Sequence, residues 1–419
     1  MGSFATPLSG LLAAQDQLQS VSNNLANINT DGYKDQNLTF ADLFSRTSAT
    51  NGSGDPLQTG YGVTTSSTVS NFSEGNLNPT SVSSNMAIAG NGFFVTQSAS
   101  GSPDYTRAGD FTTNKAGQIT TPSGEVLLGY PAVNGVINTS GALQPMQVGS
   151  GVTIPAVASS AVGMTANLDS GTALNGTTTS APLPIFDSLG NTHTLSVTYT
   201  KTAANTWTYA VTVPSADVTA GGTGATTVGQ GTLVFDNSGV LTPGTAPNLT
   251  VIGPISIPTL TDGATSPLTL TGPFGTVASP TITQTALASG TSATTTNGFA
   301  SGTLQTFSVQ ADGTIEGSFS SGNTLALGQV AVASFGNVQG LASIGNNNYV
   351  STAASGSAVV GVAGTNGRGT IEGGYVEQSN VNIATEFAKL IVAQQAYSSN
   401  AKAITTFNQV SQATLAMIQ

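Results

Sequence analysis

The chain has 419 residues, only 6% of them charged, and a formal net charge of −11 at neutral pH. A typical soluble domain is about 25% charged, and the eight Lys and Arg of this chain cannot build the basic face that nucleic-acid recognition needs. The absence of cysteine excludes disulfides, thiolate chemistry and cysteine-based metal sites. The length leaves room for two or three domains with hydrophobic cores, and the abundance of Gly, Ser, Thr, Asn and Ala favours β-rich domains with many turns.

The N-terminal segment, residues 1–32, has the apolar spacing of a helix that packs against another helix. One row of apolar residues repeats every seven positions and a second row follows it by three, namely Phe4, Leu11, Leu18 and Leu25, then Pro7, Ala14, Val21 and Ile28. This spacing is typical of a coiled-coil seam. The other faces of the predicted helix, between Phe4 and Ile28, carry Ala, Gln, Ser and Asn, with Asp16 as the only charged residue. We therefore expect this helix to be packed on several sides.

The C-terminal segment, residues 380–419, carries a second seam. Its seven-residue series, broken only at Ser411, consists of Ile383, Leu390, Tyr397, Ile404 and Ile418, and further apolar residues beside it are Phe387, Ala401, Phe407 and Leu415. Neither seam has an apolar partner next to it in the sequence. The simplest arrangement pairs the first segment with the last, so that the rest of the chain is an excursion between them.

The uncharged outer faces of both predicted helices favour a bundle built from many copies of the chain, and the alternative is a two-helix stalk within a monomer. In the bundle, the apolar residues of the two seams form the contacts between copies. The predicted polymer-interface residues are Leu11, Leu18, Val21, Leu25, Ile28, Ile383, Phe387, Leu390, Tyr397, Ile404, Phe407 and Ile418.

Between the helices the sequence predicts nested β-rich domains. Residues 33–80 are an extended connector whose aromatic side chains need somewhere to pack, and residues 365–379 form a second connector. Short strands with glycine-containing turns occupy 81–148, and the same texture returns in 298–364 to complete this first β domain. Residues 149–297 form a second β domain inserted into the first. The predicted fold class is therefore α+β and multidomain, mainly β between paired terminal helices.

Two patterns support the β assignment of the inserted domain. Apolar residues alternate in two segments, with Leu195, Val197 and Tyr199 in one and Trp207, Tyr209, Val211 and Val213 in the other. Alternation of this kind predicts strands with one buried face. Two similar units, Phe186-Asp-Ser-Leu-Gly190 and Phe235-Asp-Asn-Ser-Gly239, predict turns in which Asp bonds the local backbone.

The sequence offers little catalytic chemistry. The only histidine, His193, lies beside a predicted turn, and although the many serines would allow a Ser–His–Asp site, we favour a surface histidine at a strand edge. Paired carboxylates could be sought among Asp187, Asp236, Asp312 and Glu316, but the three Asp occupy predicted turn positions, which favours a structural role. We predict no catalytic, cofactor-binding or metal site and no enzyme activity, while a Ca²⁺ site made from turn Asp residues stays open.

Targeting signals are also absent from the sequence pattern. No run approaches the roughly 20 apolar residues of a membrane span, so we expect no membrane insertion. The first basic residue is Lys34, and the N-terminal apolar residues are spaced as a seam rather than as the apolar core of a signal peptide. Export from the cytoplasm, if it occurs, would use a route that leaves the first helix attached.

Several motifs resemble those of the bacterial flagellar axial proteins, the rod and hook subunits. They are Ser22-Asn-Asn-Leu-Ala-Asn27, Gly32-Tyr-Lys34, Phe40-Ala-Asp-Leu-Phe44, Gly90-Asn-Gly-Phe-Phe94, Tyr105-Thr-Arg-Ala-Gly-Asp-Phe111, Gly129-Tyr-Pro131, Ser379-Asn-Val381 and Ile391-Val-Ala-Gln-Gln-Ala-Tyr397 with Asn400. Three more are similar to the hook members, namely Val309-Gln-Ala-Asp-Gly-Thr314, Leu327-Gly-Gln-Val330 and Phe335-Gly-Asn-Val-Gln-Gly-Leu341. The inserted domain agrees with a hook protein, because rod proteins are shorter and lack it.

The resemblance implies a structural protein. Hook proteins form a hollow, bendable helical tube outside the cell, a universal joint that passes torque from rod to filament, with the terminal helices as inner core and the β domains as outer shells. It implies self-assembly, contacts with hook cap, distal rod and hook–filament junction proteins, and export by the flagellar type III apparatus without a cleaved signal peptide. The alternatives are a distal rod protein of the same family and an extracellular adhesin or tail-fibre-like protein, which would not need paired terminal seams.

Overall fold

The computed structural model describes residues 4–43, 45–50, 56–149, 151–219, 222–242, 255–272, 275–276 and 279–417. The chain divides into two compact units, each treated separately below. Unit 1 comprises Met1–Gly149, Thr306–Gly317 and Leu325–Gln419, and unit 2 comprises Ser150–Gln305 and Ser318–Thr324. The sequence-based division set the insert at 149–297, and its individual boundaries remain predictions.

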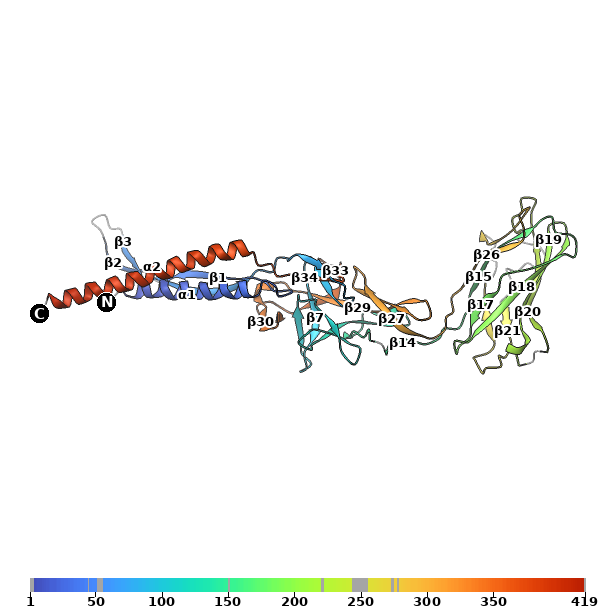
Figure 1. The fold of residues 1–419 in the computed structure, drawn as a ribbon, viewed down its shortest axis with the longest axis horizontal. Helices are drawn as coiled ribbons and strands as arrows, with labels where there is room; N and C mark the ends of the chain where they lie inside the picture. Colours follow the sequence, from blue (N-terminus) through green and yellow to red (C-terminus); the bar gives the residue numbers. More distant parts are fainter. Residues whose placement is uncertain are drawn as a thin grey trace. The chain divides into compact units, whose positions relative to one another are not determined.

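Two helices of unit 1, α1 (Ala5–Ala26) and α2 (Ile383–Ala416), pack side by side (Figure 1), as the seams predict. The contact between them is close, because a Cβ on Gly10 would lie 2.8 Å from the Nδ2 atom of Asn400. The buried apolar side chains of the helix pair are mostly small and include Ala13, Ala14 and Ala393. At the N-terminal end of α2, the side chain of Asn382 caps the helix by accepting a hydrogen bond from the Thr385 N–H at 3.1 Å.

A β-ribbon formed by the predicted connector packs on the first helix. Its strands are β1 (Gln36–Asp42) and β4 (Val63–Ser70), with β2 (Ser45–Thr50) and β3 (Pro56–Gly60) as a second antiparallel pair. Several hydrogen bonds tie the ribbon to α1; among them, Ser9 Oγ accepts the Val63 N–H at 3.1 Å and Thr65 Oγ1 donates to Asp16 Oδ2 at 2.7 Å.

The rest of unit 1 is a β domain built from both halves of the chain. Strand β29 pairs with β11 and β7, so a segment after the insert completes a sheet begun before it, as the nested order predicts. The strands, with the 3₁₀ helix η2 (Val338–Gly340), are β5 (Leu77–Pro79), β6 (Met86–Ala89), β7 (Phe93–Gln97), β8 (Pro103–Thr106), β9 (Thr112–Thr113), β10 (Ile119–Thr120), β11 (Val126–Val133), β12 (Val136–Ile137), β13 (Gln144–Pro145), β29 (Thr324–Ser334), β30 (Ala342–Gly345), β31 (Asn348–Val350), β32 (Val359–Val362), β33 (Thr370–Gly373) and β34 (Tyr375–Glu377). The unit boundary falls inside β27 (Gly302–Val309) and β28 (Thr314–Phe319).

Aromatic contacts organise one core of unit 1. Phe72, an aromatic residue of the connector, packs edge-on against Phe93 and Tyr349, with ring centroids 5.5 and 5.3 Å apart. The turn at Asn91–Gly92 separates β6 from β7, as predicted, but the two strands do not pair with each other in the described sheets. β6 pairs with β33, whereas β7 pairs with β8, β11 and β29.

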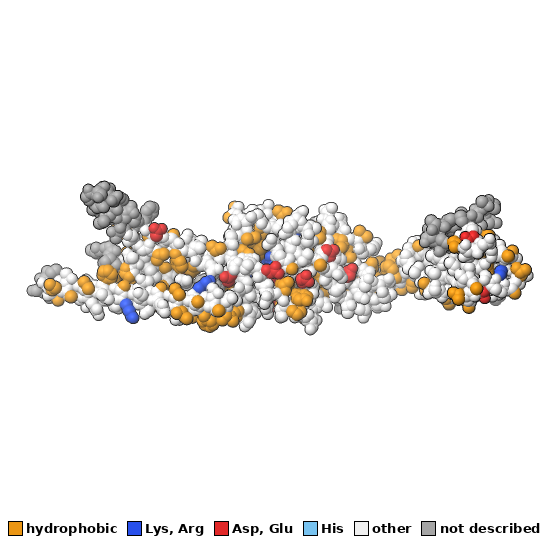
Figure 2. All heavy atoms as spheres, turned by 90° about the horizontal axis from the view of Figure 1, so that it is seen from above, with side chains coloured by type: hydrophobic (Ala, Val, Ile, Leu, Met, Phe, Trp, Pro, Cys, Tyr) orange, Lys and Arg blue, Asp and Glu red, His pale blue; other side chains and the backbone are white. Residues whose placement is uncertain are grey.

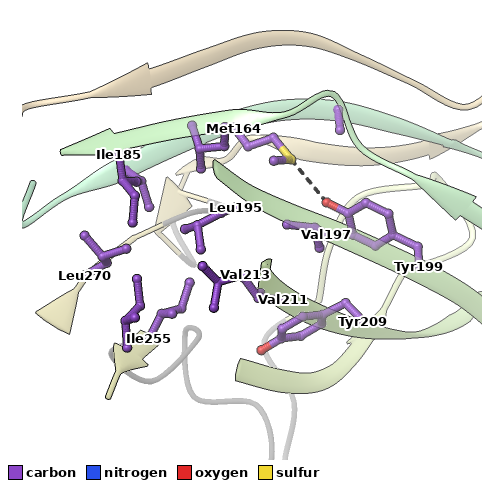
Figure 3. Packing of buried hydrophobic residues seen from close by; sticks show 14 of the residues in the cluster. Met164, Ile185, Leu195, Val197, Tyr199, Tyr209, Val211, Val213, Ile255 and Leu270 are labelled. Atoms are coloured by element: carbon purple, nitrogen blue, oxygen red, sulfur yellow. Dashed lines mark hydrogen bonds between the residues drawn. The ribbon is translucent and has the colours of Figure 1, made fainter. Parts of the chain in front are cut away.

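Unit 2 is a β domain with its own core (Figure 3). Burial alternates along β18 and β19, and the residues predicted to face inward are buried. Trp207 is fully buried and donates its indole N–H to Gln284 Oε1 at 2.8 Å. The described elements are β14 (Thr153–Ile154), β15 (Val162–Asp169), β16 (Thr177–Thr179), β17 (Leu183–Phe186), β18 (Thr192–Ala203), β19 (Thr206–Pro214), η1 (Ser215–Asp217), β20 (Ala225–Val234), β21 (Ile255–Ile257), β22 (Leu268–Leu270), β23 (Gly275–Thr276), β24 (Ser279–Pro280), β25 (Ile282–Thr285) and β26 (Gly290–Thr296).

Candidate assembly surface

The two apolar rows of α1 differ in burial. The row Pro7, Ala14 and Val21 is buried within the chain, whereas Phe4 is 40% exposed. The other members of both rows, namely Leu11, Leu18, Leu25 and Ile28, are half-buried. Outside these rows, Leu8 and Leu12 are exposed. Contacts within the chain therefore cover only part of the apolar surface near α1.

Most large apolar residues of α2 are exposed. Among the predicted interface residues, Leu390 and Ile404 are half-buried, Ile383, Phe387, Tyr397 and Phe407 are exposed, and Ile418 lies outside the described residues. Ile391 and Val392 are also exposed. The buried residues of α2 are Glu386 and Ala393. Small residues are thus the apolar side chains buried in the helix pair, while most large side chains of the α2 seam stay exposed, and their predicted contacts between copies remain a prediction.

The C-terminal end of α2 extends past its contact with α1. Phe407 lies against Phe4, one residue before α1 begins, with ring centroids 6.2 Å apart. Every described residue after Ile404 is exposed, and Met417 is 87% exposed. This end of α2 presents an apolar surface with no cover inside the described chain.

A buried group of charges, which we call the junction network, lies between the helices and the β domain of unit 1. Lys34 Nζ pairs with Glu377 Oε1, and Arg107 Nη1 lies 3.3 Å from Glu377 Oε2. All three side chains are at most 4% exposed. Arg107 also donates to the carbonyl oxygens of Ile88 and Gly90, at 3.2 and 2.7 Å. Burial lowers the pKa of Lys34 from its ordinary value, although the nearby Glu377 acts in the opposite direction.

A buried asparagine of α1 joins both helices and the ribbon. Asn24 is 1% exposed, and its Nδ2 donates to Glu386 Oε2 at 3.1 Å and to the Gln36 carbonyl oxygen at 3.0 Å. Its Oδ1 accepts the Gln36 N–H at 2.9 Å and the Tyr33 hydroxyl at 3.1 Å. One side chain therefore fixes α1 relative to α2 and β1.

The start of the C-terminal segment is held in a similar way. Asn380 Oδ1 accepts the Asp35 N–H at 2.8 Å, and its Nδ2 donates to the carbonyl oxygen of Asn71 at 2.8 Å.

The turn after α1 depends on Gly32. This residue has φ +69°, and a Cβ there would lie 2.4 Å from the backbone nitrogen of Ala108. A left-handed backbone with no room for a side chain requires glycine.

Sequence reasoning predicted neither the junction network nor the contacts of the two asparagines, although all of these residues except Glu377 lie in the motifs that carry the flagellar resemblance. Asn24 belongs to Ser22–Asn27, Lys34 to Gly32–Lys34, Arg107 to Tyr105–Phe111 and Asn380 to Ser379–Val381. The available signal was the presence of charged and amide residues in segments otherwise poor in charge. Their meeting could not be read from spacing, because Lys34 and Glu377 are 343 positions apart.

The prediction that His193 is a surface residue is wrong. His193 is 6% exposed and both ring nitrogens face carboxylates, with Nδ1 3.1 Å from Asp217 Oδ2 and Nε2 3.3 Å from Asp187 Oδ2. The strand alternation explains its burial, since position 193 shares the inward parity of Leu195 and Val197. This arrangement does not have the hydroxyl–imidazole contact of a Ser–His–Asp site.

The predicted turn roles of the aspartates are confirmed. Asp187 Oδ1 accepts the N–H groups of Leu189 and Asn191 at 2.8 and 2.9 Å. Asp236 Oδ1 accepts those of Ser238 and Val240 at the same two distances. Asp312 Oδ1 similarly accepts the Thr314 N–H at 2.9 Å.

The surface has the sparse charge that the composition predicts. Figure 2 shows charged side chains scattered among uncharged and hydrophobic ones on the face drawn.

Neither helix in the described part of the chain has the combination of length and apolarity needed to cross a membrane.

Comparison with known proteins assigns the parts of the chain to flagellar families. Residues 5–34 match a flagella basal body rod protein profile, and residues 87–167 match the flagellar hook protein FlgE/F/G D1 domain. Residues 158–299 match the flagellar basal body protein FlaE D2 domain, and residues 372–417 match the flagellar basal body rod FlgEFG protein C-terminal region.

Relatives of similar length carry one description. The Flagellar hook protein FlgE of Escherichia coli (strain K12) is 32% identical over 419 residues, covering 97% of this chain and 98% of that protein. The Flagellar hook protein FlgE of Treponema pallidum (strain Nichols) is 32% identical over 453 residues, covering 97% of each. A crystal structure of Helicobacter pylori flagellar hook protein FlgE2 has a similar fold, with a TM-score of 0.52 over 72% of this chain and all of that one, at 15% identity. Since the identity to these relatives extends over almost the whole length of both chains, this protein belongs to the flagellar hook protein family.

Proposed function

We propose that this chain is the repeating structural subunit of a flagellar hook, and that the exposed apolar residues of its terminal helices form the contacts between copies. Membership of the hook family implies self-polymerisation into the hook and association with the basal body. In the proposed hook, the α1–α2 pairs line a hollow tube and the β-rich units form its outer layers. The tube bends and transmits torque from rod to filament.

The observation that carries this proposal is the exposure of large apolar side chains on α2. Burying one such side chain contributes about 1.5–3 kcal/mol, so a helix that leaves Phe387, Ile391 and Val410 in water forgoes much of its stabilisation. Contact with further copies recovers it. A contact between two different surfaces of the same protein, repeated without closure, produces an open helical polymer. The proposed interface comprises eleven of the twelve seam residues predicted from the sequence, together with Ile391 and Val410. Val21 is excluded because it is 3% exposed and packs within the chain.

The remaining parts of the proposal follow from the family. We propose that the chain has no enzyme activity and no cofactor, and that it acts outside the cell after export by the flagellar type III apparatus without cleavage of a signal peptide. Its further partners would be the hook cap, distal rod and hook–filament junction proteins. Nucleic acid and membrane lipid are not among the proposed partners, in keeping with the acidic balance of the chain.

A pair of matched substitutions tests the helix interface. Ile391 on α2 and Ile344 on β30 are both 53% exposed. Ile391→Asp should raise the critical concentration for tube formation at least about tenfold, because an interface that loses about 1.4 kcal/mol weakens tenfold. Ile344→Asp should change it much less. Electron microscopy and sedimentation of the full chain over a concentration series provide the measurement.

The folding of each variant must be checked, because loss of tubes through unfolding would carry no information about the interface. Trp207 is the only tryptophan and is buried in unit 2, so its emission reports that core. Far-ultraviolet circular dichroism reports the helices and strands of the chain as a whole. If the folded Ile391→Asp chain forms tubes as readily as the wild type, the proposed interface is wrong.

A further inference from the structure

A charged cluster in unit 2, which the proposed assembly function does not use, surrounds the only histidine. His193 lies near the start of β18, and its ring is contacted by carboxylates from three separate loops. Asp187 comes from the turn between β17 and β18, Asp217 from η1, and Asp262 from the loop between β21 and β22. Asp262 Oδ2 lies 3.3 Å from His193 Nε2, the same distance as Asp187 Oδ2, and Asp217 Oδ2 is 3.1 Å from Nδ1.

The geometry of the cluster requires hydrogen on both ring nitrogens. A neutral imidazole carries one N–H and one lone pair, whereas imidazolium donates from both nitrogens. With carboxylates on both sides of His193, a neutral ring would turn a lone pair toward one of them. Asp187 is fully buried, so water cannot replace the lost donor unless the loops move apart.

The other contacts between the loops do not depend on charge. Asn191 Nδ2 donates to Asp187 Oδ2 at 3.2 Å and to Asp262 Oδ2 at 3.1 Å. The Thr265 N–H donates to Ser188 Oγ at 2.8 Å. These hydrogen bonds hold the β21–β22 loop on the β17–β18 turn, but they leave two carboxylates that repel each other when the imidazole is uncharged.

We propose that the imidazolium of His193 is a pH-sensitive pin that ties the three loops at this end of unit 2 and releases them when it loses a proton. Asp187, Asp217 and Asp262 are the charged groups that face the ring from the elements packed around it. Loss of the proton turns the attraction of the ring for these carboxylates into repulsion among the carboxylates themselves. Unit 2 then loses stability, and the β21–β22 loop separates from the β17–β18 turn.

The shifts in pKa have the sign that this mechanism requires. Burial by itself lowers the pKa of His193, but hydrogen bonds to Asp217 and Asp187 and the attraction of Asp217 and Asp262 raise it above the ordinary value of 6.5. A raised pKa in the folded state means that the stabilisation is complete below pH 6.5 and is lost as the pH rises through the pKa of the folded protein.

Asp187 determines the lowest pH at which the same pin is stable. Burial raises its pKa, but the interactions of its carboxyl group with the side chain of Asp262, the backbone N–H of Asn191 and the ring of His193 together lower the pKa to about 2. Its contribution to stability is therefore complete above pH 3.8 and is lost as the pH falls toward 2. The pin should hold most firmly between these two limits.

The chain contains a matched pair of turns for the first test. Asp187 and Asp236 accept the same backbone hydrogen bonds in similar turns, but of these two only Asp187 contacts the ring of His193 in the described structure. Because His193 is the only histidine, proton NMR of the imidazole in the full chain follows its titration without assignment. Its midpoint should lie above 6.5 in the wild type, fall in Asp187→Asn, and stay at the wild-type value in Asp236→Asn. A midpoint at or below 6.5 in the wild type would overturn the proposal.

A second test measures the consequence for unit 2. Urea unfolding of the full chain, followed by Trp207 emission, should give a lower midpoint at about pH 9 than at about pH 5. In His193→Gln that decrease should be much smaller, since glutamine does not titrate. An equal decrease in wild type and variant would show that other groups cause it and would overturn the pin. The NMR titration of the wild type decides the matter if the variant does not fold.

Discussion

At the scale of single residues, the junction network is costly and therefore informative. Three charges are removed from water at Lys34, Arg107 and Glu377, and the desolvation of such groups usually offsets most of their mutual attraction. The contribution of these three charges is to fix the relative positions of the segments that carry them. The network joins Lys34 in the segment after α1, Arg107 directly after strand β8, and Glu377 in strand β34. A shifted alignment of these segments would leave a charge buried without a partner.

Glu377→Gln should destabilise unit 1 by about 3–5 kcal/mol, because Lys34 and Arg107 would stay buried without their carboxylate. Calorimetry of the full chain measures the unit 1 transition, while Trp207 emission should show unit 2 unchanged. The control is Glu316→Gln, since Glu316 is exposed and a change there should stay within about 0.5 kcal/mol. An equal effect of the two substitutions would contradict this account of the network.

At the scale of elements, the helix pair is unequal. α1 has 22 residues and α2 has 34, so one helix cannot cover the other along its whole length. Isolated helical ends are marginally stable in water, and the exposed Val410, Leu415 and Met417 gain little from the described chain. We infer that this end is stabilised by neighbouring copies.

Ending the chain after Phe407 should separate folding from assembly. The shortened protein retains Phe407 against Phe4 and the whole junction network, so its thermal unfolding should be close to that of the full chain. Tube formation should be lost at concentrations where the full chain assembles. Retention of tubes in electron micrographs would show that the end of α2 is dispensable for assembly.

At the scale of the whole molecule, the two units differ in how much of their stability we expect to depend on assembly. Unit 2 closes its core around residues such as Trp207 and Tyr199, whereas unit 1 also carries helices with uncovered apolar surface.

The low charge of the chain bears on how the proposed polymer would bend. We propose that weak contacts among Ser, Thr and Asn can be exchanged as outer domains slide past one another, whereas charge pairs between those domains would resist sliding.

Limited proteolysis of the dilute chain with a protease of broad specificity should remove α1 and α2 before it cleaves the cores that contain Phe93 and Trp207. The reason is that few apolar contacts protect the helices until other copies cover them. Assembled tubes, treated in the same way, should retain both helices. Persistence of intact helices in a monomer confirmed by sedimentation would contradict the proposed interface.

The sequence predicted the features that depend on local periodicity. Seven-residue spacing located both helices, and alternation located the buried faces of β18 and β19, because each pattern is set by the geometry of one element. The nested order of the β segments was also predicted, because the pattern of short strands and glycine-containing turns recurs after the insert. The twelve interface residues follow from the same periodicity, but their contacts between copies remain predictions.

What the sequence alone determined was the kind of element formed by each periodic segment. The tertiary structure decided which residues those elements bring together. It buried mostly small apolar residues between α1 and α2, gave β6 and β7 different partners, and buried His193 among three carboxylates. It also joined Lys34 to Glu377 across 343 positions. The physical reason is that burial and charge pairing depend on neighbours supplied by distant segments, whereas helix and strand periods depend only on the adjacent chain.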